Sequence, residues 1–282
     1  TEDAASARYF FTSPQYKLHG PDRYPYWRAQ LIHADRYAGH FTYGYNGCWW
    51  ADDLGYTYNG GYTDATWGHY SGYFGGIDNF LTLTGEGGAF ENKLMHAVGQ
   101  IMKALYYQRY TDIFGELPYS QAGEEGVVTP KFDTQADIYQ GLIAELNEAM
   151  ATIGDNEITG EGPENLGQND LYYGGDLKKW KKLANTLKLR LGLRAYGAEG
   201  AGFAETTIQE AIKAGLFLVD ETDNALLPKD TEISQWNSAC YGDIWHGFAG
   251  AGSGWKISRP VIDNLREYGD PRLRKYAQPA AG

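Results

Sequence analysis

The chain has 282 residues, of which 43% are hydrophobic, and a formal charge of −12. An acidic balance of this size disfavours a nucleic-acid surface, because such a surface needs Lys and Arg to replace phosphate counterions. The sequence also has no run of about 18 apolar residues, so it predicts no helix that crosses a bilayer.

Helical spacing predicts three helices in the first half of the chain. The opening residues are rich in Pro and Tyr and are expected to form a loop. The first helix is expected from about Tyr26 to Gly39, and the second from Asp64, its acidic cap, to Leu83. The third has apolar residues at helical spacing from Leu94 to Leu105 and is expected to end at Gly115.

Four more helices are expected in the second half. The first begins at Asp133 or Thr134 and ends at Gly154, since either residue can accept from the free N–H groups of a first turn. Another is expected between residues 176 and 196, and a short one ends at Gly215. The last covers SRPVIDNLREYG, residues 258–269, whose proline is tolerated in the first turn.

The helix over residues 176–196 is the most regular of them. Asp176 precedes it and can cap its first turn. One apolar stripe recurs at helical spacing: Trp180, Leu183, Ala184, Leu187 and Leu191. Its basic residues are expected mostly off that stripe: Lys178, Lys179, Lys181, Lys182, Lys188 and Arg190.

Successive helices with no convincing series of strands predict an all-α protein of stacked antiparallel helix pairs, with long aromatic-rich loops between some of them. The fragment WKKLANTLKLRLGLRAY is similar to the first helix of a tetratricopeptide repeat, although no strict 34-residue period is present. We expect one helical domain over residues 1–282.

Four blocks carry a family resemblance: ALYYQRYTDIFGELPYSQA (104–122), PKFDTQADIYQGLIAELNEAM (130–150), LYYGGDLKKWKKLANTLKLRLGLR (171–194) and YGDPRLRKYAQP (268–279). In order and spacing they resemble the SusD/RagB family of Bacteroidetes outer-membrane nutrient-binding lipoproteins. The resemblance covers roughly residue 64 to the end and is looser before residue 62.

The resemblance implies a tetratricopeptide-like helical fold on the extracellular face of the outer membrane. Such a protein covers a SusC-type TonB-dependent transporter, captures glycans or oligopeptides for it, and catalyses no reaction. Two departures stand out. The lipidated N-terminal Cys of the family is missing, so we expect a lipid anchor outside this chain, and relatives continue well beyond Gly282, so we expect the domain to be incomplete at its C-terminus.

Two aromatic and polar clusters are the candidate ligand site. Aromatic faces stack on the C–H faces of sugars or on peptide side chains, and nearby carboxylates accept from hydroxyls or amides. The first cluster is Trp49, Trp50, Asp52, Asp53, Tyr56 and Tyr58, and the second is Trp236, Asn237, Tyr241 and Trp245. Each tryptophan could instead pack on the helices, but the adjacent Trp49 and Trp50 cannot both point into one core.

We expect no metal and no cofactor. The acidic spots at residues 52–53 and 220–223 lack the spacing of a calcium loop, and the six His residues form no HExxH or HxH pair. Cys48 and Cys240 could be disulfide-bonded or be two separate thiols.

Two alternatives to a binding protein stay open. The first is an all-α glycoside hydrolase that uses two carboxylates among Asp52, Asp53, Glu116 and Asp243. The second is a tetratricopeptide adaptor that grips protein partners in a helical groove. The sequence does not distinguish a glycan from a peptide ligand, because aromatic stacking accepts both.

Overall fold

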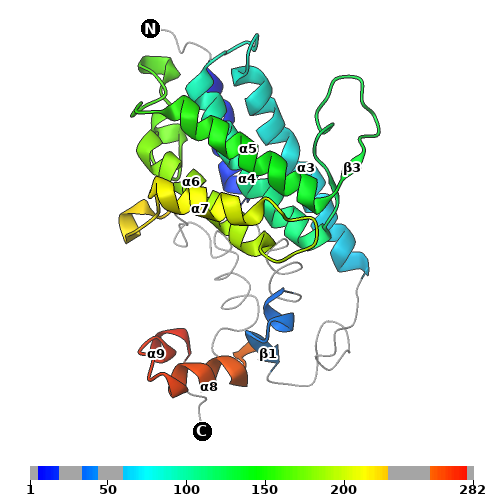
Figure 1. Cartoon of the computed structure of the whole chain (residues 1–282), viewed down its shortest axis with the longest axis vertical. Helices are drawn as coiled ribbons and strands as arrows, with labels where there is room; N and C mark the ends of the chain where they lie inside the picture. The colour runs from blue at the N-terminus through cyan, green and yellow to red at the C-terminus, as the bar shows by residue number, and fades with distance from the viewer. Residues whose placement is uncertain (1–5, 19–33, 44–59, 228–254, 278–282) are drawn as a thin grey trace. The chain divides into compact units, whose positions relative to one another are not determined.

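A computed structural model describes residues 6–18, 34–43, 60–227 and 255–277 (Figure 1). The chain divides into two compact units, which are described separately. Unit 1 consists of Thr1–His19 and Tyr70–Pro228, and unit 2 of Gly20–His69 and Lys229–Gly282.

Unit 1 is a stack of helices that pack in chain order. Helix α4 packs on α5, α5 on α6, and α6 on α7, and α4 also contacts α6 (Figure 1). Its longer elements are α1 (Thr12–Leu18), α3 (Gly60–Thr84, in this unit from Tyr70 on), α4 (Lys93–Phe114), α5 (Gln135–Ile153), α6 (Leu177–Ala195) and α7 (Ala204–Ala214). Short 3-10 turns lie at Ala7–Phe10 (η1), Gly162–Glu164 (η3), Gly167–Asn169 (η4) and Glu221–Asp223 (η5). The predicted all-α fold is confirmed.

Local sequence signals set the ends of these helices. The side chains of Thr134 and Asp176 cap α5 and α6, each accepting from backbone N–H groups of the first turn. Helices α4, α5 and α7 end at Gly115, Gly154 and Gly215, as predicted. No helix in the described residues is long and apolar enough to cross a membrane.

The predicted stripe of α6 is buried as expected, and Trp180 and Leu191 are fully covered. Lys188, expected mostly off the stripe, is also buried. Its Nζ donates to Asn147 Oδ1 of α5 at 2.8 Å and to Glu210 Oε2 of α7 at 2.6 Å. The ammonium is tolerated because both neighbouring helices supply an oxygen acceptor.

Two sequence expectations for unit 1 and α3 are wrong. The opening residues form α1 rather than a loop, because Pro14 lies in the first turn, where no intrahelical N–H bond is lost. Helix α3 already includes Gly60, so Asp64 lies inside it and does not cap it.

A short two-stranded sheet joins β2 (Leu117–Pro118) to β3 (Phe132–Asp133). Strands of two residues are too short to show a strand period in the sequence.

A buried carboxylate, Asp170, joins the N-terminal segment to α6. Its Oδ1 accepts from Gln15 Nε2 of α1 at 2.7 Å, and its Oδ2 accepts from Trp180 Nε1 of α6 at 2.7 Å and from the Gly175 N–H at 2.9 Å. The N–H groups of Tyr172 and Tyr173 also donate to Oδ1. Five donors from three parts of the chain therefore converge on one carboxylate that is 3% exposed.

Unit 2 contains a second two-stranded sheet and two short helices. Strand β1 (Phe41–Tyr43) pairs antiparallel with β4 (Trp255–Ile257), and α8 (Arg259–Glu267) and α9 (Leu273–Tyr276) follow. The predicted last helix is α8, with a proline in its first turn as expected.

Two glycines end helical turns in unit 2. Residues 34–37 are helical, and a turn follows at Ala38 and Gly39, where the predicted helix was expected to stop. The Gly39 φ of 71° lets the His40 N–H donate back to the Asp35 carbonyl. At the end of α8, Gly269 has a φ of 57° and the Asp270 N–H returns to the Leu265 carbonyl in the same way. Both glycines have left-handed backbone conformations, which are unfavourable for residues that carry a Cβ atom.

Candidate functional site

All ten predicted ligand-binding residues lie outside the described residues. The first six belong to residues 44–59 and the other four to residues 228–254: Trp49, Trp50, Asp52, Asp53, Tyr56, Tyr58, Trp236, Asn237, Tyr241 and Trp245. Cys48, Cys240 and Asp243 lie outside them too. These predictions stay predictions.

The described residues that flank the two predicted clusters in the sequence are paired with each other. Tyr43, which precedes the first cluster's segment, is the register partner of Trp255, which follows the second cluster's segment, in the antiparallel β1–β4 pair.

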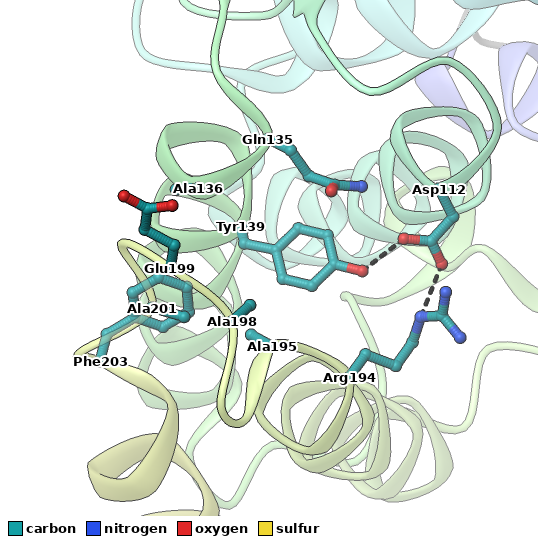
Figure 2. Close-up of a pocket in the computed structure, with 10 residues that line it drawn as sticks. All are labelled: Asp112, Gln135, Ala136, Tyr139, Arg194, Ala195, Ala198, Glu199, Ala201 and Phe203. Carbon is teal, nitrogen blue, oxygen red and sulfur yellow. Dashed lines mark hydrogen bonds and ion pairs between the residues drawn. The ribbon is translucent and has the colours of Figure 1, made fainter.

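A described pocket of about 290 Å³ lies in unit 1 where α5 begins and α6 ends (Figure 2). Four of its lining residues have the small side chain of alanine: Ala136, Ala195, Ala198 and Ala201. Polar groups come from Gln135, Glu199 and Arg194, and Phe203 closes one side. The volume is at the lower end of the range for small-molecule sites.

The polar side of this pocket is a hydrogen-bonded network around Asp112, the last-turn carboxylate of α4. Figure 2 shows Asp112 between the Tyr139 hydroxyl, which donates to its Oδ1, and Arg194, whose Nε lies 2.8 Å from its Oδ2. Gln108 donates to the same Oδ2. Burial first, and then the hydrogen bond to Asp112, raise the pKa of Tyr139 to about 12, so its hydroxyl keeps its proton at neutral pH.

This network was not predicted from the sequence, although the side chains that form it can all donate or accept hydrogen bonds. Asp112 and Arg194 stand inside two of the blocks quoted for the family resemblance, but on separate helices. A carboxylate in one helix and an arginine 82 residues later in another give no local signal that they will pair; only the packing of α4 against α6 brings them together.

Some of the acidic residues considered for a metal site or for hydrolysis lie in the described part of the chain, and two of them are hydrogen-bonded to neighbouring protein groups. Asp220 accepts from the Thr222 N–H at 2.7 Å, and buried Asp223 is bonded to Lys182 Nζ at 2.9 Å and to the Val219 N–H at 3.0 Å. Glu116 is exposed to solvent. Among the described residues no group of three or more His, Cys, Asp or Glu side chains is placed to hold a metal ion.

A cluster of buried tyrosines lies between α3 and α4. The rings of Tyr70 and Tyr106 stack at 5.3 Å, and the Tyr110 ring lies 4.9 Å from each of them. Burial raises the pKa values of Tyr70 and Tyr110 to about 12, and that of Tyr106 is raised as well. Such phenols must remain neutral for the native packing to persist.

We therefore expect stability to fall at high pH. The pKa of these tyrosines is raised in the folded chain above the ordinary 10.0, so their contribution is complete below about pH 10 and is lost as the pH rises through about 12. Denaturant unfolding at about pH 9, 10 and 11 measures how the free energy of unfolding changes with pH, and tyrosinate absorbance is a second probe. Tyr139→Phe should reduce this dependence on pH, and a free energy of unfolding that stays level from about pH 9 to about pH 11 would contradict the expectation.

Comparison with known proteins identifies the family. The SusD-like family described as "Starch-binding associating with outer membrane" matches residues 29–282. The chain belongs to this family, and the resemblance read from the four sequence blocks is confirmed. A search of curated proteins finds no match.

Three solved structures illustrate the likeness. A chitin-binding protein has 29% identity and a TM-score of 0.75 over 95% of this chain and 54% of its own. A SusD homologue from Bacteroides uniformis has 22% identity and a TM-score of 0.76 over 96% and 54%. A chitin-binding SusD homologue from Flavobacterium johnsoniae has 18% identity and a TM-score of 0.76 over 95% and 53%. The last two show the fold alone, and the chain spans about half the length of each structure.

Proposed function

We propose that this SusD-like chain binds a nutrient glycan at the outer membrane and delivers it to a SusC-type TonB-dependent transporter. The observation that carries the proposal is the family match over residues 29–282, in a family described as starch-binding and associated with the outer membrane. The chain is proposed to be a binding protein and not an enzyme. Its proposed location is the extracellular face, held by a lipid anchor.

The proposed ligand site is built from both aromatic clusters, with Trp49, Trp50, Trp236 and Trp245 as its stacking faces. The segments that carry the two clusters are flanked in the sequence by Tyr43 and Trp255, which are partners in the β1–β4 pair. Aromatic faces and the carboxylates of Asp52 and Asp53 suit a neutral, hydroxyl-rich oligomer. An adaptor function would instead use a groove on the helical face of unit 1.

The ligand that we favour is a glycan rather than an oligopeptide. The solved protein with 29% identity is described as chitin-binding, so chito-oligosaccharides are the first ligands to test. The oligopeptide remains the alternative outcome of the same titration. Co-purification of the native protein with a large β-barrel transporter tests the proposed partner, and isolation of a lone monomer would count against it.

Replacing Trp49 with alanine is expected to weaken binding of a chito-oligosaccharide by about tenfold or more. Loss of one stacking face costs on the order of 1–2 kcal/mol, and about 1.4 kcal/mol corresponds to tenfold. Trp50→Ala and Trp236→Ala test whether the two clusters act on one ligand. Isothermal titration calorimetry is the measurement.

The matched control is Tyr268→Ala, since this tyrosine of unit 2 is 75% exposed and lies outside both clusters. Its affinity should stay within twofold of the wild type, roughly the error of such a titration. Unchanged affinity in all three tryptophan variants would refute the proposed site. Product release from the glycan that is abolished by Asp52→Asn or Asp53→Asn would instead favour the hydrolase.

A further inference from the structure

A second cavity, of about 500 Å³, opens in unit 1 between α4 and α6. Three arginines line it: Arg109 from α4, and Arg190 and Arg194 from successive turns of α6. We call it the arginine cavity. It shares Asp112 and Arg194 with the pocket of Figure 2.

The charges around the arginine cavity do not balance. Asp112 is the single carboxylate in its described lining, against three guanidinium groups. In a chain whose formal charge is −12, a cavity with an excess of two positive charges is unusual. Fixed positive charges of this kind attract an anion, most strongly where protein walls reduce screening by water.

Most of the hydrogen-bond donors in this cavity are not used by the described residues. Arg109 donates Nη1 to the Leu18 carbonyl at 2.8 Å, and Arg190 donates Nη2 to Gln108 Oε1. Arg194 places its Nε 2.8 Å from Asp112 Oδ2. A guanidinium carries five N–H donors, so each keeps several for an oxyanion.

The other lining residues indicate which chemical group is attached to the anionic group of the ligand. Leu105, Ile113 and Leu183 supply aliphatic surface, and the described lining contains no aromatic ring on which a sugar could stack. The side chain of Leu183 is buried, whereas Ile113 is 49% exposed, so the apolar wall runs from the interior to the mouth. A short branched aliphatic group fits such a wall better than a polyhydroxylated ring does.

We propose that the arginine cavity binds a carboxylate attached to a small aliphatic group, with the carboxylate on Arg109 and Arg190 and the aliphatic group against Leu105 and Leu183. This goes beyond the proposed glycan binding and does not depend on it. Chito-oligosaccharides are uncharged, so a failure of one proposal leaves the other intact.

The test is an NMR titration of the isotope-labelled protein with isocaproate, a branched six-carbon carboxylate. We expect saturable shifts at the cavity with isocaproate and none with isocaproamide, its uncharged isostere. Arg190→Gln should weaken isocaproate binding at least fivefold, and Arg190→Lys should weaken it less, since lysine keeps the charge but not the two-pronged geometry.

The control is Lys213→Gln, which removes the same charge from an exposed position of α7 outside the cavity lining. Its affinity should change less than twofold, roughly the precision of the titration. Circular dichroism spectra that match the wild type establish that each variant is folded. Absent binding, equal binding of acid and amide, or an equal loss in Lys213→Gln would each overturn the proposal.

A further arm separates two sources of the same chemistry. N-acetylleucine presents the carboxylate and aliphatic branch of a peptide C-terminus, whereas isocaproate is a free acid. Tighter binding of N-acetylleucine indicates a peptide terminus, and tighter binding of isocaproate indicates a free organic acid. Both outcomes support the carboxylate site.

Discussion

Replacing Asp170 with alanine is expected to lower the free energy of unfolding of unit 1 by about 3–5 kcal/mol. The carboxylate accepts from five donors, and among them the Gln15 amide and the Trp180 indole are themselves fully buried. Without it, these donors stay away from water and lose their acceptor, and each unsatisfied buried group costs about 1–3 kcal/mol before relaxation. Denaturant unfolding followed by far-ultraviolet circular dichroism measures the change.

Asp155→Ala is the matched control for this effect. Asp155 is exposed between α5 and α6, so its removal should change the free energy of unfolding by no more than about 0.5 kcal/mol. If Asp170→Ala costs less than about 1 kcal/mol, the convergence of donors on this carboxylate does not contribute to stability as argued. A native circular dichroism spectrum at low denaturant shows whether the variant still folds.

The role of Asp170 was not predictable from the sequence. It precedes the capped start of α6 by a few residues, and nothing local distinguishes it from Asp176, whose capping role was predicted and confirmed. The difference is Gln15, which lies 155 positions away and reaches Asp170 only after α1 packs against the loop before α6. A contact at that separation leaves no periodic or capping signal.

The helices themselves were largely predictable, since their signals are local. The apolar period and the capping residues placed α4, α5, α6 and α7 close to their observed limits. Prediction failed for α1, where Pro14 suggested a loop, and for Lys188, whose burial depends on acceptors from two other helices. Local spacing predicts which residues form a helix, but not which charged side chains find a partner.

The two candidate sites also differ in whether local sequence indicates them. The aromatic clusters were noticed because Trp, Tyr and Asp occur together within short segments, and they remain a prediction. The arginine cavity was not noticed, because Arg109 belongs to one helix and Arg190 and Arg194 to another. From the sequence, Arg190 was expected to lie off the apolar stripe of its helix, and no expectation was made for Arg109 or Arg194.

Replacing Trp180 with alanine should also cost about 3–5 kcal/mol in the free energy of unfolding. The indole is fully buried, and its ring centre lies 5.9, 5.8 and 5.4 Å from those of Phe11, Tyr172 and Tyr173. Truncation leaves a large cavity among these rings and removes one donor from Asp170. Tyr196→Ala, at the exposed end of α6, is the control and should cost about 0.5 kcal/mol or less.

Trp180→Phe separates the hydrogen bond from the packing, because phenylalanine keeps most of the apolar contact but has no N–H. We expect it to cost about 1–2 kcal/mol, with the remainder of the alanine effect assigned to the cavity. In a double-mutant cycle with Asp170→Ala, the two changes share one bond, so their costs should fail to add by about 0.5 kcal/mol or more. Additive costs would mean that the Trp180–Asp170 bond contributes nothing of its own, and that the cost of Trp180→Ala comes from lost packing.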